Sequence, residues 1–198
     1  MKLITLSGVD GSGKSTQLKL LKEKLKQDGK KVFYFHAIEF SLANRLARLF
    51  KNEKGFVPGK EKASVQSSWM SLRLRKLFLL LDIVRFKVLM RKLVQEKYDY
   101  ILSDRYFYDS VINVLYLSKN TTTLLCEQYI PKPDVAFYFH ITAEEILKRD
   151  RVPEQGIEYL SDKIAIFEQK KRVFGLISID ASQDKTTILS SLKKSIIS

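Results

Sequence analysis

The residues from Gly8 to Thr16 have the types and the spacing that suit the binding of phosphate groups. They read Gly-Val-Asp-Gly-Ser-Gly-Lys-Ser-Thr and fill every fixed position of the pattern G-x-x-x-x-G-K-[ST]. In such a loop the backbone N–H groups turn inward around an anion, and the dipole of the following helix favours negative charge. A chance glycine-rich turn is the alternative interpretation. The pattern favours binding of ATP or GTP.

Two side chains of this loop are candidates for direct roles. The ammonium group of Lys14, which we expect at an exposed loop position, would reach the β- and γ-phosphates. The hydroxyl of Ser15 would bind Mg²⁺. The predicted cofactor-binding residues of the loop are Gly8, Gly11, Ser12, Gly13, Lys14, Ser15 and Thr16.

A carboxylate and a guanidinium follow one another in Asp104-Arg105-Tyr106, directly after an apolar segment. A carboxylate at a strand end beside a phosphate loop can hold Mg²⁺ through water. The guanidinium of Arg105 offers two parallel N–H donors to a phosphate. The alternative is a salt bridge at the end of the strand, and the phosphate loop favours the functional interpretation.

Asp10 lies inside the phosphate loop. Its carboxylate would repel the nucleotide phosphates unless it points across the cleft, where it could accept a hydrogen bond from a sugar hydroxyl or organise an arginine. The alternative is a variable position with no role.

Arg149 and Arg151 precede a segment that contains Pro153 and Gly156. An arginine on a mobile segment can close over a phosphoryl group during its transfer. The alternative is a solvated helix end whose cations interact with the helix dipole. We therefore predict a short lid at about residues 149–157.

The pattern of apolar segments predicts the elements that position these residues. Strands are expected at residues 3–6, 31–35, 99–103, 135–139 and 176–179. Because helical patterns separate the strands, the fold class is predicted as α/β, a P-loop NTPase-type three-layer fold with a five-stranded parallel sheet and helices on both faces. Ligands bind such sheets at the carboxyl ends of the strands, so these ends should face one cleft.

The connecting segments complete one predicted domain over residues 1–198. A capping box at Thr142–Glu145 should open a helix that continues to about Asp150. Another helix is expected after the phosphate loop and ends at the stop at residues 28–29. Helices are also expected at 42–50, 63–96, 109–117 and 123–129, with a loop at 52–60. Two more follow, one between the predicted lid and about residue 173 and one at the carboxyl terminus.

The bulk composition narrows the class of protein. The single cysteine, Cys126, suits a reducing cytosol, and the longest apolar run, near Leu77–Leu81, is too short to cross a bilayer. We therefore expect a cytoplasmic protein with no membrane segment. The net charge of +13 has two interpretations: an acidic partner, either nucleotides or nucleic acid, or a lysine-rich surface, which the even spread of lysines favours.

The long helix predicted at residues 63–96 is apolar over a wide arc. A helix of this kind is buried on more than one side, which makes a homodimer interface plausible. Its arginines and lysines are interpreted as a solvated face.

Taken together, these motifs resemble those of the thymidylate kinases, a family of P-loop nucleoside monophosphate kinases, over nearly the whole chain. Gly8–Thr16 resembles the phosphate loop of the family, including its internal acidic residue, Asp10. Asp104-Arg105-Tyr106 followed by Ser110 resembles its Asp-Arg-Tyr motif, and Pro133-Asp134 resembles the entry into its fourth strand.

The resemblance implies transfer of the ATP γ-phosphoryl group to a nucleoside monophosphate, with dTMP as the first candidate acceptor and ATP and Mg²⁺ as cofactors. It assigns catalytic roles to Lys14, Asp10, Arg105, Arg149 and Arg151, and Mg²⁺ binding to Ser15 with Asp104 behind it. It also implies that Ser182 and Gln183 lie beside the adenine. Position 12 is Ser, so the charge that the loop lacks would come from a lid arginine.

Three positions on the acceptor side depart from the family. Residues 36–40 lack the arginine that the family carries after its second strand, Asp82 is followed by Ile83 in place of arginine, and about Val114 the family has Gln or Thr. The alternatives are therefore another acceptor (UMP, CMP or a nucleoside), or an ATP-binding, nucleic-acid-associated protein without kinase activity.

Overall fold

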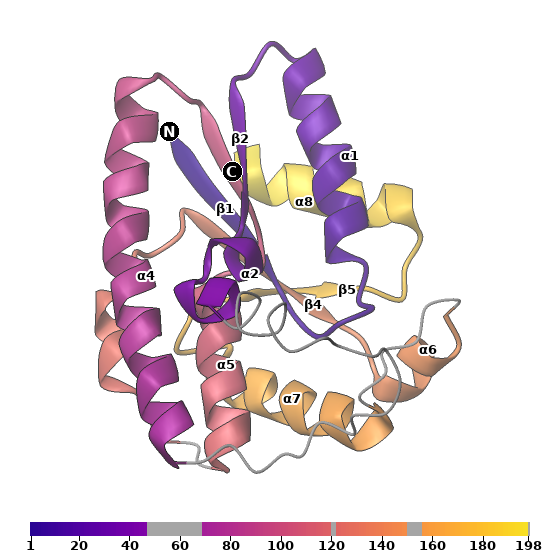
Figure 1. The fold of residues 1–198 in the computed structure, drawn as a ribbon. Coiled ribbons are helices and arrows are strands. Elements are labelled where there is room, and N and C mark those ends of the chain that lie inside the picture. The colour runs from indigo at the N-terminus through magenta and orange to yellow at the C-terminus, as the bar shows by residue number, and fades with distance from the viewer. Residues whose placement is uncertain (47–68, 120–121, 150–155, 198) are drawn as a thin grey trace, which may run out of the picture.

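A five-stranded sheet forms the centre of the computed structural model, which describes residues 1–46, 69–119, 122–149 and 156–197 (Figure 1). The strands are β1 (Lys2–Ser7), β2 (Val32–His36), β3 (Tyr100–Asp104), β4 (Val135–His140) and β5 (Ile177–Asp180). They lie in the order β2-β3-β1-β4-β5, and every pairing is parallel. The predicted α/β class with a five-stranded parallel sheet is confirmed, and it is consistent with the P-loop NTPase type.

The helices surround this sheet (Figure 1). They are α1 (Lys14–Gln27), α2 (Ala37–Phe40), α4 (Trp69–Gln95), α5 (Phe107–Ser118), the 3₁₀ helix η1 (Leu125–Tyr129), α6 (Ala143–Leu147), α7 (Gly156–Lys170) and α8 (Lys185–Ile197). Among them, α1 packs against α8, and α5 packs against both α4 and α7. None of the described helices combines the length and the apolar character needed to cross a bilayer.

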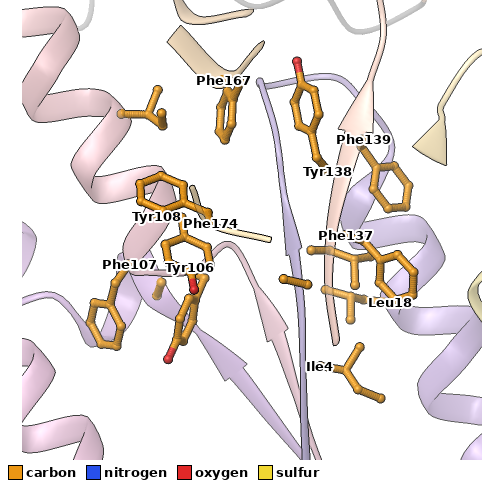
Figure 2. Packing of buried hydrophobic residues seen from close by; sticks show 14 of the residues in the cluster. Ile4, Leu18, Tyr106, Phe107, Tyr108, Phe137, Tyr138, Phe139, Phe167 and Phe174 are labelled. Atoms are coloured by element: carbon orange, nitrogen blue, oxygen red, sulfur yellow. The ribbon is translucent and has the colours of Figure 1, made fainter. Parts of the chain in front are cut away.

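The core lies on both faces of the sheet, because successive side chains of a strand point to opposite faces. In β4, Phe137 and Tyr138 are both fully buried. Figure 2 shows Leu18 of α1 beside Phe137, and Phe167 of α7 near Tyr138. The rings of Tyr138 and Phe167 are stacked, with centroids 5.0 Å apart. Burial on both faces explains why these strands read as continuous apolar runs.

The parallel register brings the carboxyl ends of the strands to one edge. Asp104 at the end of β3 pairs with Leu6 of β1 and with His36 of β2. On the other side of β1, Ser7 pairs with Tyr138, and His140 pairs with Asp180. The loops that carry the predicted chemistry therefore begin at the same edge of the sheet.

The helices differ from the predicted boundaries in several places. Helix α7 begins at Gly156, so residues 156–157 of the predicted lid are helical, and it ends at Lys170 rather than at about 173. The expected helix at 123–129 is a 3₁₀ helix over Leu125–Tyr129. The helix opened by the Thr142 capping box ends at Leu147 rather than at about Asp150. After it the Arg149 N–H donates to the carbonyl of Ile146 at 3.0 Å, the i→i+3 pattern of a tightened turn.

Several predictions fall wholly or partly outside the described residues. Of the helix predicted at 42–50, residues 42–46 are described and helical, and the long helix is described from Trp69 onward. The loop at 52–60 and residues 150–155, which include Arg151 and Pro153, lie outside the described part of the chain.

Candidate active site

The phosphate loop connects β1 to α1 and depends on glycine at two points. Gly13 precedes α1 with φ 94°, a left-handed conformation that side chains rarely adopt. At Gly8 a Cβ atom would lie 2.9 Å from the carbonyl oxygen of Phe139, so only glycine lets the loop pass this close to β4. These two positions bring the backbone over the first turn of α1.

Lys14 is buried, although the sequence suggested an exposed loop position. Its Nζ donates to the carbonyl of Val9 at 2.7 Å and to the Oγ of Ser12 at 3.0 Å. Burial, and then the charge of Arg105, lower the pKa of Lys14 to about 8. A phosphate anion beside this ammonium group would restore the preference for its charged form.

A cavity of about 980 Å³ lies in front of the loop. The predicted site residues that line it are Asp10–Thr16, Asp104, Arg105, Arg149 and Gln183. Gly8, at the start of the loop, does not line the cavity, and its N–H donates to Asp109. Ser182, beside Gln183, donates from its N–H and its Oγ to Asp180 at the end of β5. The structure thus brings the predicted donor-side residues to one edge of the sheet.

Ser15 and Asp104 both line this cavity and offer oxygen ligands of the kind that Mg²⁺ prefers. Tyr34 donates its hydroxyl to Oδ2 of Asp104 at 3.0 Å. No hydrogen bond within the described residues engages Oδ1, so that this oxygen is available to a hydrated cation. Tyr34 of β2 is exposed to solvent, so its side chain serves Asp104 rather than the core. Burial and the Asp104 carboxylate raise the pKa of Tyr34.

Arg105 connects the phosphate loop to the end of β3. Its guanidinium pairs with the Asp10 carboxylate, and its Nη1 lies 3.5 Å from Oδ1 of Asp109. Its backbone has φ 61°, which is uncommon for a residue with a side chain. The surrounding contacts must hold this conformation in place. Asp10 therefore organises an arginine, one of the two roles considered for it.

Asp109 is a site residue that the sequence reasoning missed. Its buried carboxylate accepts hydrogen bonds from Ser7 Oγ at 2.6 Å, from the Gly8 N–H at 3.2 Å and from the Tyr106 N–H at 2.9 Å. An acid three residues after Tyr106, in the first turn of α5, was the available signal, since such residues cap helices. The bonds to Ser7 and Gly8 join residues about a hundred positions apart, which helix capping alone does not predict.

A second cavity of about 280 Å³ lies on the other side of Arg105. It shares Asp10 and Arg105 with the first cavity, and Asn113 and Tyr159 line it. Val114, one of the positions that departs from the family pattern, lines it as well, whereas Ile83 is fully buried in the core. Two ligands bound in these cavities would therefore meet at Asp10 and Arg105.

Lys163 of α7 also lines the second cavity and was likewise missed. Only 9% of its surface is exposed. Its Nζ donates to the hydroxyl of Tyr159 at 2.5 Å. Burial, and then the nearby charge of Arg105, lower the pKa of Lys163 to about 8.

Arg149 and two arginines of α4, Arg75 and Arg85, are placed differently. Arg149 donates from Nη1 to the carbonyl of Gly11 at 2.7 Å and from Nη2 to the carbonyl of Ala181 at 2.6 Å, so it bridges the phosphate loop and the loop after β5. Arg85 pairs with Asp82 at 2.5 Å and donates to the carbonyl of Phe40, whereas Arg75 lines the second cavity.

The comparisons with known proteins agree with the family resemblance seen in the sequence. The family model for thymidylate kinase matches residues 6–191. A probable thymidylate kinase of Pyrococcus horikoshii is 27% identical over 172 residues, which cover 85% of this chain and 78% of the relative. A thymidylate kinase of Plasmodium falciparum is 29% identical over 178 residues, covering 86% and 76%.

Replacement of Asp109 tests its structural role. Asp109→Asn presents an amide N–H₂ to groups that are themselves donors and removes the charge opposite Arg105, so we expect a loss of about 2–4 kcal/mol in the free energy of unfolding. Urea denaturation measures it. The control Asp28→Asn removes an exposed partner of Lys24 and should cost under about 0.5 kcal/mol. Equal losses in the two variants would contradict the role of Asp109.

The pKa of Lys163 gives a pH-dependent stability prediction. Its folded pKa of about 8 lies below the ordinary 10.5, so its charge opposes folding by about 3 kcal/mol below pH 8. This penalty disappears as the pH rises from 8 to 10.5. We expect Lys163→Met to be more stable than the wild type at pH 7, with the difference shrinking by pH 10. Denaturant unfolding at both pH values measures this, and a variant less stable by the same amount at both would contradict it.

Proposed function

The chain belongs to the thymidylate kinase family, and from this membership we propose that it transfers the γ-phosphoryl group of ATP to a nucleoside monophosphate, with dTMP as the first acceptor. The names of its relatives support this acceptor. The observation that carries the proposal is the pair of cavities that share Asp10 and Arg105. Phosphoryl transfer needs two phosphate-bearing ligands whose reacting ends meet, and this arrangement provides that meeting point.

In the proposed reaction ATP occupies the larger cavity. The backbone N–H groups of Gly11–Thr16 face its phosphates, and Lys14 holds the γ-phosphoryl group. Ser15 and Asp104 would hold Mg²⁺, which when bound neutralises charge on the β- and γ-oxygens. Gln183 lines the same cavity, and with Ser182 would lie beside the adenine.

The acceptor nucleotide occupies the second cavity, with its phosphate at Arg105. An oxygen of that phosphate forms a bond to the γ-phosphorus, while the bond to the bridging oxygen breaks and ADP keeps the electron pair. The acceptor oxygen is already anionic, so the step requires no general base. Asp10 keeps the Arg105 fork facing both cavities.

Arg149 supplies further positive charge to the phosphates of ATP in the larger cavity. Its guanidinium already contacts the phosphate loop through Gly11. On binding of ATP we expect it to exchange carbonyl oxygens for phosphate oxygens, which are stronger acceptors. Arg151, two residues further on, is proposed as its companion in the lid.

We also propose that two copies of the chain pair through α4. Four of the exposed apolar side chains of this helix form one stripe, with 42–60% of each exposed: Leu77, Leu81, Val84 and Val88. Their spacing of four, three and four residues places them on a single face. A second copy of the same stripe would cover them in a two-fold symmetric interface.

The first test compares acceptors. We expect ATP consumption by the wild type with dTMP, and less or none with dUMP, UMP, CMP, AMP, GMP and thymidine, measured by coupled detection of ADP. Lys14→Met keeps the buried side-chain volume and removes the ammonium group, so turnover should fall by at least about 10³-fold while the fold is retained. An active Lys14→Met variant would contradict the loop assignment, and absence of turnover on every acceptor would contradict the kinase proposal.

The dimer is tested by charge insertion. Val84→Glu places two carboxylates at the centre of the stripe and should convert a dimer to a monomer in light scattering coupled to size-exclusion chromatography. The matched control Val173→Glu changes a side chain that is also well exposed but lies outside α4. A monomeric wild type, or a dimeric Val84→Glu variant, would contradict the proposed interface.

A further inference from the structure

Lys163 is a buried cation without a carboxylate partner in the described part of the chain. The ion pairs found there within 4.0 Å do not include it, and its hydrogen-bond partner is the neutral hydroxyl of Tyr159. Burial raises the pKa of Tyr159 to about 12, so this hydroxyl remains neutral at physiological pH. A buried ammonium group without an anion is costly, and such groups usually have a ligand or a partner.

The nearby carboxylates are already engaged. Asp10 pairs with Arg105, and Asp109 accepts hydrogen bonds from Ser7 and from two backbone N–H groups. Neither lies within ion-pair distance of Lys163, although both act on it through their charge. The cavity therefore holds an ammonium group whose counter-charge must come from elsewhere.

Another buried lysine of the same helix shows what a structural role looks like. Lys170, two turns further along α7, places its Nζ 3.3 Å from the carboxylate of Glu127 and 3.3 Å from the Oγ1 of Thr123. Its charge is neutralised within the protein. Lys163 instead resembles Lys14, which is also buried, bonded to neutral oxygens and directed to a cavity.

We propose that Lys163 binds the phosphate of the acceptor nucleotide together with Arg105, an assignment that rests on the proposed function. A monophosphate carries two negative charges at neutral pH and several acceptor oxygens, and so can engage both an ammonium group and a guanidinium fork. Neither the base nor the sugar of a nucleotide supplies such a charge. The hydroxyl of Tyr159 accepts a hydrogen bond from this ammonium group, and Asp10 and Arg105 line the same cavity.

The test distinguishes binding of the acceptor's phosphate from binding of its base and sugar. Lys163→Met should raise the KM for dTMP by about 10- to 100-fold, the value of one charge-assisted hydrogen bond, and leave the KM for ATP within twofold. Inhibition by thymidine, which lacks the phosphate, should stay within twofold of the wild type. Lys163→Arg keeps the positive charge and should recover part of the loss.

Lys171→Met serves as the matched control, since it removes the same charge next to the end of α7, outside the cavity. An unchanged KM for dTMP in Lys163→Met would overturn the assignment, as would equal losses for dTMP and thymidine. Circular dichroism of each variant separates these outcomes from unfolding. A wild type that turns over no nucleoside monophosphate would instead contradict the proposed function itself.

Discussion

The guanidinium of Arg105, held between the carboxylates of Asp10 and Asp109, is the interaction on which the site depends. Asp109 binds Ser7 and Gly8 at the end of β1 and Tyr106 at the start of α5, so one buried carboxylate ties the phosphate loop to the segment that carries Arg105. Such a carboxylate is stable in the interior only because each of its oxygens is bonded. The uncommon backbone conformation of Arg105 follows from the same contacts.

The packing around the start of α5 keeps this arrangement rigid. Tyr106 and Phe107 lie in a cluster of aromatic rings, and Figure 2 shows both side chains packed beside the sheet. The Tyr106 hydroxyl donates to the carbonyl of Pro131 at 2.6 Å, and the ring of Phe86 in α4 lies 5.3 Å from that of Phe107. These contacts restrain the first turn of α5, which carries Asp109, because close-packed side chains resist displacement. The second cavity therefore has a preformed wall.

The strands and the phosphate loop could be predicted from sequence because their signals are local. Apolar runs bounded by turn residues identify β1 to β5 to within about two residues, and the glycine spacing identifies the loop. Burial of Lys14 could not be predicted, because it depends on how the loop folds back on its own side chain. The burial of Lys163 could not be predicted either. In a chain with 35 lysines and arginines, a lysine on a helix indicates a solvent-exposed position. The role of Asp109 required the fold, since the groups that it binds come together only through the sheet register.

The proposed reaction requires that the two cavities bring a donor and an acceptor phosphate together at Arg105. The most direct measurement follows the labelled γ-phosphoryl group of ATP in the presence of dTMP and the wild-type protein. We expect the label in the β-position of the nucleoside diphosphate, with one ADP formed for each labelled product. Label that appears only in inorganic phosphate would contradict it, because water rather than a bound acceptor would then occupy the meeting point.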